Sequence, residues 1–540
     1  MRGLSRLFDE IVNCGWKSQK TASLLIACGY CAVVGMALTQ HEMWRDEMEA
    51  WLLARDSDSI PQLFNNLRNE GHPGLWYVLL MPLTRLSHSP ELMQVLHLGI
   101  ATTTVYLVSR YSPLSRLQLL LFPLGFYTAW QYSVVSRNYA LGVLLLTTFC
   151  VLYTRRDELF PLVGVVLMLA AHTHALVLIL VIAIGIGLAV DMRSVLAQGQ
   201  NELSAKRTRG IVVGFCLVVL GVITSFIQLV PDAHYRGPID WVVRILRGHV
   251  STIGSASLLG VVLFLFFLYQ LRDRAAPLVM YGLGAVGAVL YFDSSVLGAI
   301  AGAPGIKLFA LTGLLSYLFF LYQLRDRLSI LLMYGLGTAG LLVFFSGVHS
   351  GGPHQHGLLF IALFVVYWLE RLTRSKPPDR LQSRQNRTAD VIFTLLLLSQ
   401  SVFGMKALYQ DLTTPYSNGK YAAQYIRSQG WQDISIVGCM DFAAQTVVGY
   451  LGVKKIYYPQ GERWGSYVVW DEKRYENVGL DQCLRSARSL GRDVLVVSSY
   501  PDDSSLREPQ FHKVAEFRGA LRDDENFILY KYSPAGEPRL

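Results

Sequence analysis

Apolar runs long enough to cross a bilayer recur along most of this chain and predict a helical membrane protein. Basic residues precede the first run, at residues 21–39, which we expect to be retained as an uncleaved anchor. The pattern predicts thirteen spans, at residues 21–39, 91–108, 117–135, 139–154, 159–172, 175–190, 210–230, 256–270, 276–292, 308–323, 328–346, 357–369 and 389–408.

Composition agrees with this class. The chain has 540 residues, of which 52% are hydrophobic, and its mean hydropathy is +0.34. The net charge of +9 is therefore read for orientation in the membrane and not as a sign of a nucleic-acid partner. Basic residues fall in alternate loops, for example at Arg155 and Arg156. This predicts a cytoplasmic N-terminus, with the loop at about 40–90 and the C-terminal residues on the opposite, outer side.

An internal repeat supports part of the span pattern. Residues 266–274 and 319–327 have the identical sequence FFLYQLRDR, and MYGLG follows each copy. Each copy is expected to form a helix, a basic turn and a second helix. Because both copies run in the same orientation, the repeat indicates a duplicated scaffold more than a transporter's inverted repeat, although a transporter stays open.

The sequence divides into two domains, at residues 1–410 and 411–540. Helical and extended patterns alternate in the second part, without any apolar run of spanning length, and predict an extramembrane α/β domain. Its loop Gly461–Asp471 carries three aromatic residues that either stack on sugar rings or contact the membrane portion. Cys439 and Cys483 both belong to this domain, and their spacing does not decide whether they form a disulfide.

The first outer loop carries the strongest candidate chemistry. Apolar positions from Trp44 to Leu52 recur at helical spacing, which predicts an amphipathic helix with its aromatic edge among lipid headgroups. Asp46 and Glu47 then occupy its first turn, where the helix dipole favours ionised carboxylates. Such a group can act as a general base toward an acceptor hydroxyl, or it can simply cap the helix. Residues 71–86, interrupted by Pro82, are too short to span and predict a second helix in the outer interface.

Three short motifs in this order resemble the GT-C superfamily of membrane glycosyltransferases. They are the acidic pair in WRDE (Trp44 to Glu47), the His-Pro of GHPGLWYVLL (Gly71 to Leu80) and the Arg-x-Tyr of SRNYAL (Ser136 to Leu141). The likeness is greatest to bacterial relatives of protein mannosyltransferases and aminoarabinose transferases. The chain departs from the family at Gly74, where a second proline is common. The motifs cover about the first 155 residues, and the remainder is similar only in architecture.

The resemblance implies a GT-C-like fold and an inverting sugar transfer from a polyprenyl-phosphate donor at the outer face of a bacterial inner membrane. It implies that Asp46 deprotonates the acceptor, which is a glycan, a lipid or a protein, while Glu47 and His72 position the substrates. Arg137 stands between two apolar runs with few charges nearby. Its guanidinium is therefore a candidate to pair with the donor phosphate.

Histidines near a later outer end are a further candidate site. His354 and His356, with His349, can supply nitrogen ligands for a divalent metal beside Asp46 or Glu47, or they can contact a phosphate. Alternatively, this glycine-rich turn only closes a helix pair.

Two other classes of protein stay open. A transporter or flippase of a lipid-linked glycan also has many spans, but it usually places ionisable residues near the membrane midplane. A non-catalytic assembly factor that presents its outer domain to a partner would tolerate loss of both Asp46 and Glu47. The gathering of polar residues at outer span ends favours the enzyme.

Overall fold

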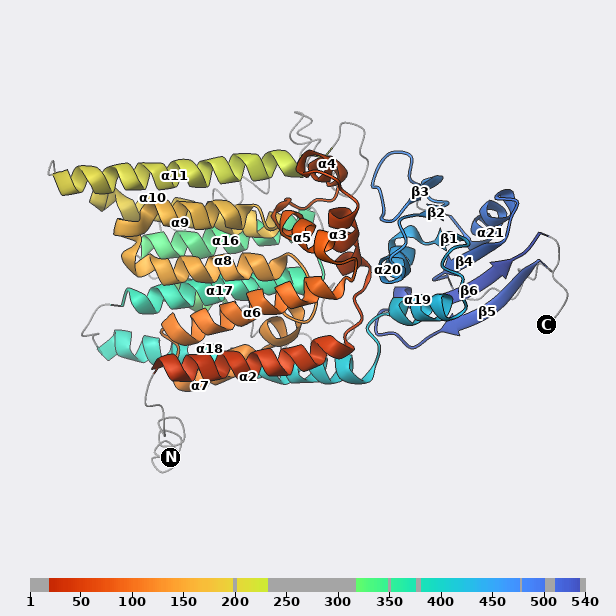
Figure 1. Cartoon of the computed structure of the whole chain (residues 1–540). Coiled ribbons are helices and arrows are strands. Elements are labelled where there is room, and N and C mark those ends of the chain that lie inside the picture. The colour runs from red at the N-terminus through yellow and green to blue at the C-terminus, as the bar shows by residue number, and fades with distance from the viewer. Residues whose placement is uncertain are drawn as a thin grey trace, which may run out of the picture.

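The computed structural model describes residues 19–197, 202–231, 317–347, 351–374, 380–475, 478–500 and 510–534. These residues form a bundle of long helices with a smaller α/β domain at one end (Figure 1). Seven of the described helices are long and apolar enough to cross a membrane. They are α2 (Gln19–Gln40), α6 (Glu91–Tyr111), α10 (Ala175–Ala197), α11 (Glu202–Leu229), α16 (Leu328–Gly347), α17 (Pro353–Leu372) and α18 (Arg380–Thr413). The predicted class, a polytopic helical membrane protein with a C-terminal α/β domain, is confirmed.

Other predicted spans have different outcomes. Helices α8 (Tyr139–Leu152) and α9 (Arg156–Ala171) form where expected, but they have 14 and 16 residues, fewer than the roughly 20 that a span usually needs. The predicted spans at 256–270 and 276–292, most of 308–323, and the first repeat copy lie outside the described residues. The second copy has the expected form, with a helix through residue 323, a turn and then α16.

The prediction of one continuous span at 117–135 is wrong. The segment is instead divided into α7 (Arg116–Leu121), the 3-10 turn η1 (Phe122–Leu124) and the π-helical segment η2 (Phe126–Gln131). Pro123 and Gly125 interrupt the helical hydrogen bonding. The exposed backbone then packs against α18 at Gly404, where a Cβ atom would lie 2.1 Å from the Leu124 oxygen. A hydropathy pattern records the apolar character of this segment but not its break.

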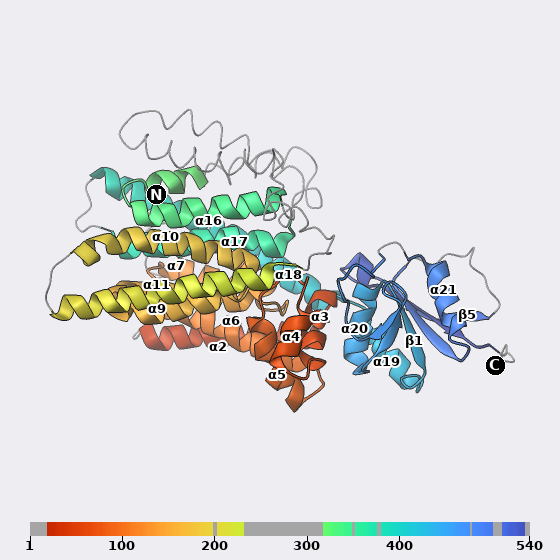
Figure 2. The same cartoon turned by 90° about the horizontal axis from the view of Figure 1, so that it is seen from above.

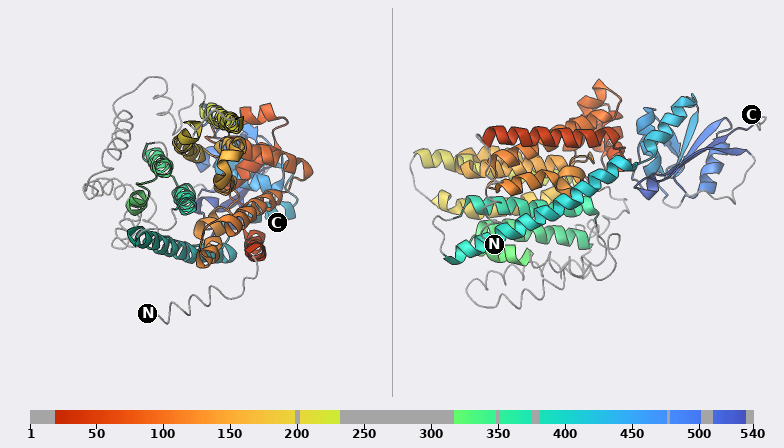
Figure 3. Two further views of the ribbon diagram at one scale, coloured as in Figure 1. Left: turned by 90° about the vertical axis from the view of Figure 1, so that its left-hand side faces the viewer. Right: turned by 90° about the horizontal axis from the view of Figure 1, so that it is seen from below.

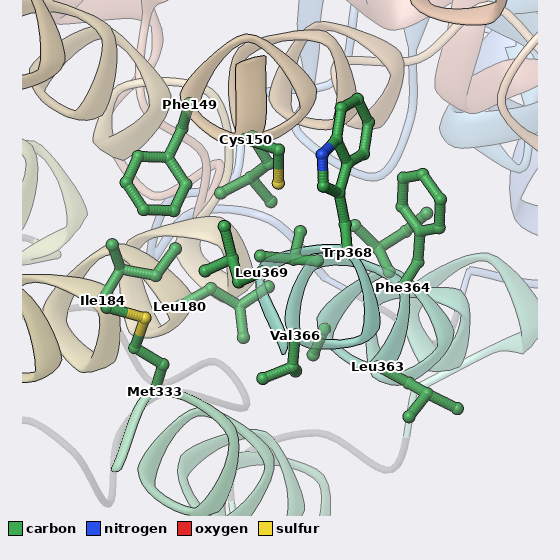
Figure 4. Close-up of a cluster of buried hydrophobic side chains, with 14 of the residues drawn as sticks. Phe149, Cys150, Leu180, Ile184, Met333, Leu363, Phe364, Val366, Trp368 and Leu369 are labelled. Atoms are coloured by element: carbon green, nitrogen blue, oxygen red, sulfur yellow. The ribbon is translucent and has the colours of Figure 1, made fainter. Parts of the chain in front are cut away.

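Close packing between helices builds the core of the bundle. Large side chains from α17, including Phe364 and Trp368, meet residues of α8, α10 and α16 in one buried cluster (Figure 4). Viewed end-on, α9 and α11 lie side by side (Figure 3). Gly164 allows this approach, since a Cβ atom there would lie 2.5 Å from the Gly214 oxygen. The helices of the bundle therefore pack closely at these contacts.

The predicted loop helices lie at the end of the bundle that faces the α/β domain (Figure 2). They are α3 (Arg45–Arg55) and α5 (Leu75–Leu86). A third short helix, α4 (Ile60–Asn66), lies between them in the chain and was not predicted. The first turn of α3 contains both Asp46 and Glu47, as predicted. Helix α5 is short and apolar and contains Pro82, also as predicted. Its N-terminus is anchored by the Leu75 amide, which donates to the His172 oxygen at 3.2 Å.

The predicted headgroup contact of α3 is wrong, because protein covers its apolar side. Trp51 and Met48 are fully buried, in one cluster with residues of the C-terminal domain. Met48 packs on helix α20 (Asp441–Leu451) at Gly449, where a Cβ atom would come within 2.0 Å of the Met48 sulfur. Amphipathic periodicity identifies an apolar face but does not reveal whether lipid or protein covers it.

The C-terminal domain has the predicted helices and strands. Its sheet has six strands in the order β3-β2-β1-β4-β6-β5, with β1 parallel to β2 and β4 and the other pairs antiparallel. The elements are α19 (Gly419–Ser428), β1 (Ser435–Cys439), α20, β2 (Ile456–Tyr458), β3 (Arg463–Gly465), α21 (Leu480–Ser489), β4 (Val494–Ser498), β5 (Phe511–Phe517) and β6 (Phe527–Tyr532). Only β3 was not expected.

The aromatic loop and the two cysteines of this domain are also placed. Trp470 donates its indole N–H to Glu49 of α3 at 3.3 Å, so this residue contacts the membrane portion, one of the two expected roles. Trp464 stays 39% exposed. Cys439 and Cys483 are buried free thiols within one small core and form no disulfide in the structure.

The contact between Met48 and Gly449 predicts a coupled pair of substitutions. Gly449→Ala places a methyl group where the Met48 side chain lies, which should destabilise the docked domain by about 1–3 kcal/mol. Adding Met48→Ala should recover part of that loss, because the smaller side chain vacates the space. Thermal unfolding and protease resistance of the purified protein measure both effects. If the stability losses of the two single variants simply add in the double variant, the two residues are not in contact.

Candidate active site

A buried bridge of charged side chains fixes the chain between α2 and α3. His41 Nδ1 lies 2.9 Å from Asp411 of α18, and its Nε2 lies 3.1 Å from Glu47. Burial disfavours a charge on His41, but the carboxylates of Asp411 and Glu47 raise its pKa well above the ordinary value. Glu47 also accepts hydrogen bonds from the backbone amides of Trp44 and Ser136. Both oxygens of Glu47 are thus used inside the protein, and its side chain is completely buried.

Asp46, the neighbour of Glu47, points to a different environment. Its side chain keeps 26% of its surface exposed and forms ion pairs with Arg137 and, at 3.5 Å, with Arg45. Burial tends to raise the pKa of Asp46, yet the charges of Arg137 and Arg45 hold it below its ordinary value. Asp46 is therefore an ionised and accessible carboxylate.

Arg137 is held at this place by the loop that follows η2. The ring of His97 on α6 lies 2.9 Å from the Ser133 oxygen and 3.0 Å from the Arg137 oxygen, so it fixes both ends of this loop. The guanidinium bonds Asp46 through Nη1, and Nη2 lies 3.5 Å from His72 Nε2. Its side chain is 13% exposed. The broken segment at 116–135 thus brings a cation to the predicted acid.

Four rings pack beside the same site. His72 lies 4.7 Å from His174 between ring centroids, and His174 lies 4.3 Å from Tyr139. His354, at the start of α17, lies 5.7 Å from Tyr139 and within electrostatic range of Asp46. Burial lowers the pKa of His174 well below its ordinary value, so this ring is neutral. The predicted residues His72, Arg137 and His354 are therefore gathered around Asp46.

The histidine-rich turn does not assemble a metal site in the described residues. His356 packs edge-on against Phe345 at 4.7 Å, and His349 lies outside the described part of the chain. Nowhere in that part do three or more His, Cys, Asp or Glu side chains form a group suited to a metal. His172, another histidine near this end of the bundle, lies with its Nε2 at 2.9 Å from the Thr224 hydroxyl of α11.

Two further acids stand beside Asp46. Burial, followed by the negative charge of Asp46, raises the pKa of Glu49 to about 7. Glu70 is also raised well above its ordinary value, by burial and by the charge of Glu49. The Asn69 side-chain amide donates to the Trp470 oxygen at 2.8 Å and holds this part of the loop against the domain. Glu49 and Glu70 therefore keep their protons to a higher pH than ordinary glutamates do, whereas the pKa of Asp46 is lowered.

The C-terminal domain contributes directly to the site. The Arg45 amide donates to the Glu525 carboxylate at 3.0 Å, and the Arg45 side chain pairs with Asp524. Arg522 stacks its guanidinium over the Trp44 ring at 4.1 Å, and its charge helps to lower the pKa of Asp46. Burial raises the pKa of Glu525 to about 8. Arg522 is thus a third cation near Asp46, after Arg137 and Arg45, and it comes from the C-terminal domain.

Sequence reasoning missed the residues whose role depends on tertiary contact. Arg45 is adjacent to Asp46 in WRDE, and Tyr139 belongs to the SRNYAL motif, so the motifs already contained a signal for both. His41 and Asp411 flank predicted spans, which is a weak signal at best. Arg522 carried no signal, since it stands in a short charged loop of a separate domain.

The fold and the site together define a multi-span helical membrane protein with an ionised carboxylate where the bundle meets an α/β domain. Among solved structures, the chain is similar to crystal structures of ArnT from Cupriavidus metallidurans in the apo state and bound to undecaprenyl phosphate. The TM-scores are 0.41 and 0.42, with 13% and 14% sequence identity, and each similarity covers 96% of this chain and 99% of the other. No protein-family model and no curated protein matches the chain.

The raised pKa of Glu49 predicts a pH dependence of stability. An acid that resists ionisation in the folded protein lowers the free energy of unfolding as pH rises from its ordinary value of 4.5 to about 7. Glu49→Gln keeps a side-chain oxygen that can accept the hydrogen bond from Trp470, and it removes this pH-dependent loss of stability. Because Glu49 also raises the pKa of Glu70, the substitution should flatten the profile further.

Unfolding midpoints at pH 5, 6, 7 and 8 compare the native chain with this variant. Glu472→Gln, an exposed acid of the same domain interface region, is the matched control and should leave the profile unchanged. Parallel profiles for the native chain and Glu49→Gln would contradict the assignment.

Proposed function

We propose that this protein is an inverting glycosyltransferase that moves a sugar from a polyprenyl-phosphate donor to an acceptor hydroxyl. One observation carries the proposal, namely the accessible Asp46 carboxylate paired with Arg137 where a membrane-spanning bundle ends. The pair combines a base with an anion-binding group at the place where a lipid-linked substrate presents its headgroup. A buried pair would serve stability only, but this carboxylate keeps 26% of its side-chain surface exposed.

Asp46 acts as the general base in this proposal. Its carboxylate takes the proton of the acceptor hydroxyl, and the oxygen attacks the anomeric carbon on the face opposite the phosphate. The bond between the anomeric carbon and the phosphate oxygen breaks, and polyprenyl phosphate leaves with the electron pair. The configuration at the anomeric carbon is inverted.

Arg137 acts on the leaving group. A guanidinium binds phosphate oxygens in a planar fork and offsets the negative charge that develops as the bond breaks. In the free protein Arg137 is bonded to Asp46 and lowers the pKa of that carboxylate. When donor phosphate engages the guanidinium, Asp46 loses part of this stabilisation and becomes a stronger base. Binding of the donor therefore prepares the Asp46 carboxylate to accept the proton of the acceptor hydroxyl.

The remaining side chains position these groups and the substrates. His174 and Tyr139 are buried and pack in a row that holds the partly exposed His72 beside Arg137, where the His72 ring can meet a sugar. His354 approaches from α17, and Arg522 from the domain adds positive charge near the phosphate position. Glu47 is completely buried by its bonds to His41 and the backbone, so we assign it to positioning Asp46 and not to the reaction. His356 supports the turn that carries His354.

The proposed orientation follows from the charge pattern of the loops. The site and the α/β domain face the periplasm, and the helices cross the bacterial inner membrane. The acceptor is a glycan, a lipid or a protein that reaches this side, and a divalent metal is not required by the proposed roles. The donor is expected to enter from the bilayer.

The central test replaces the Asp46 carboxylate by an amide of similar shape that cannot act as a base. Asp46→Asn should abolish transfer of radiolabelled sugar from a panel of polyprenyl-phosphate sugars while the protein still inserts and folds. Asp58→Asn alters an exposed acid of the same loop and should transfer sugar like the native chain. Full activity of Asp46→Asn would remove this residue from the mechanism. Donor binding without transfer by the native chain would favour a transporter.

The role of Arg137 predicts a distinct effect. Arg137→Lys keeps the charge but lacks the planar fork, so it should lower kcat by about 10²-fold or more, as loss of a transition-state contact does. It should also raise the pH needed for activity, because lysine lacks the Nη1 group that bonds Asp46 and so stabilises this carboxylate less. The pH profile of kcat, measured with the native chain as reference, checks both effects. An unchanged kcat with a higher KM would restrict Arg137 to donor binding.

A further inference from the structure

A lateral groove lies between the bundle and the C-terminal domain, away from the Asp46 site. It consists of two adjoining cavities of about 260 and 340 Å³. Both are lined by Glu91, Lys420 and Tyr450, so they form one continuous depression. The first cavity runs along α2 and α6, whose ends adjoin there, and the second runs beneath α19 and α20.

The two halves of the groove differ in chemistry. The half on the bundle is apolar, with Gly35, Leu38, Val95 and Leu98 along the last turns of α2 and the first turns of α6. Val95 is 65% exposed, and a Cβ atom at Gly35 would still lie 3.7 Å from Leu98, so the floor is shallow and open. Both α2 and α6 are long and apolar enough to cross a membrane.

The half on the domain carries positive charge. Lys420, in the first turn of α19, makes no hydrogen bond or ion pair with any described residue. Arg427 follows on the same helix and is fixed by its bond to the Tyr450 backbone oxygen at 2.8 Å. Glu91 is the one carboxylate among the described residues that line the groove. Two cations thus stand directly beyond the ends of two spans.

We propose that this groove binds an anionic phospholipid of the leaflet on the side of the domain. One acyl chain lies along the apolar half between α2 and α6, and the phosphate lies between Lys420 and Arg427. Charge complementarity and the position of the cations at the membrane boundary support this occupant. The Tyr450 hydroxyl accepts from the Met43 amide at 2.7 Å, and His41 forms the inner wall. These contacts separate the groove from Asp46, so the lipid differs from the donor.

Native mass spectrometry of the full chain, released from nanodiscs with equal amounts of phosphatidylglycerol and phosphatidylcholine, tests the proposal. The native chain should retain phosphatidylglycerol preferentially. Lys420→Gln should reduce that preference about fivefold, the effect of one interfacial cation. Arg492→Gln removes an exposed cation between α21 and β4 and should leave the preference unchanged. Val95→Trp covers the apolar half and should reduce retention of both lipids.

Three results would overturn the proposal. They are equal retention of the two lipids, an unchanged preference in Lys420→Gln, or displacement of phosphatidylglycerol by undecaprenyl phosphate at stoichiometric amounts. The last result would make the groove an entrance for the donor. Because lipid retention is measured without sugar transfer, failure of the proposed enzyme activity would leave this test intact.

Discussion

The bridge from Asp411 through His41 to Glu47 is the constraint on which the site depends. It joins the end of the first span to α18, the last long helix of the bundle, and Glu47 extends it to the backbone at Ser136. Buried ions are tolerated only when partners surround them, so each member of the bridge commits the others to one arrangement. This arrangement also sets the position of Asp46. Because its neighbour Glu47 points into the protein, the Asp46 side chain stays partly exposed. An acid pair in the sequence thus becomes one structural and one accessible carboxylate.

The α/β domain is part of the site as well as an appendage. Its helix α20 covers the apolar side of α3, and its loop around Asp524 and Arg522 contacts Arg45 and Trp44. The domain therefore fixes the helix that carries Asp46 from the side opposite the bundle. A rigid support of this kind keeps a reacting group in place without consuming substrate binding energy.

Much of this architecture was predictable from the sequence, for identifiable reasons. The long apolar helices, the first turn of α3 and nearly every element of the C-terminal domain follow from local patterns. His72, Arg137 and His354 were predicted as separate candidates, and only the fold brings them to Asp46. The break at Pro123 and Gly125 was missed because hydropathy does not measure backbone hydrogen bonding. The cover over Met48 and Trp51, and the stacking of Arg522 on Trp44, involve residues hundreds of positions apart and leave no local trace.

The contact between Arg45 and the Glu525 loop also has a consequence for biosynthesis. The two partners are 480 residues apart, so nearly the whole chain is made between them. At 5–20 residues per second, the ribosome needs roughly half a minute to a minute and a half for that length. Helix α20, which packs on Met48 at Gly449, is also made late in this interval. The side of α3 that α20 covers therefore lacks its final packing partner until most of the chain has been made.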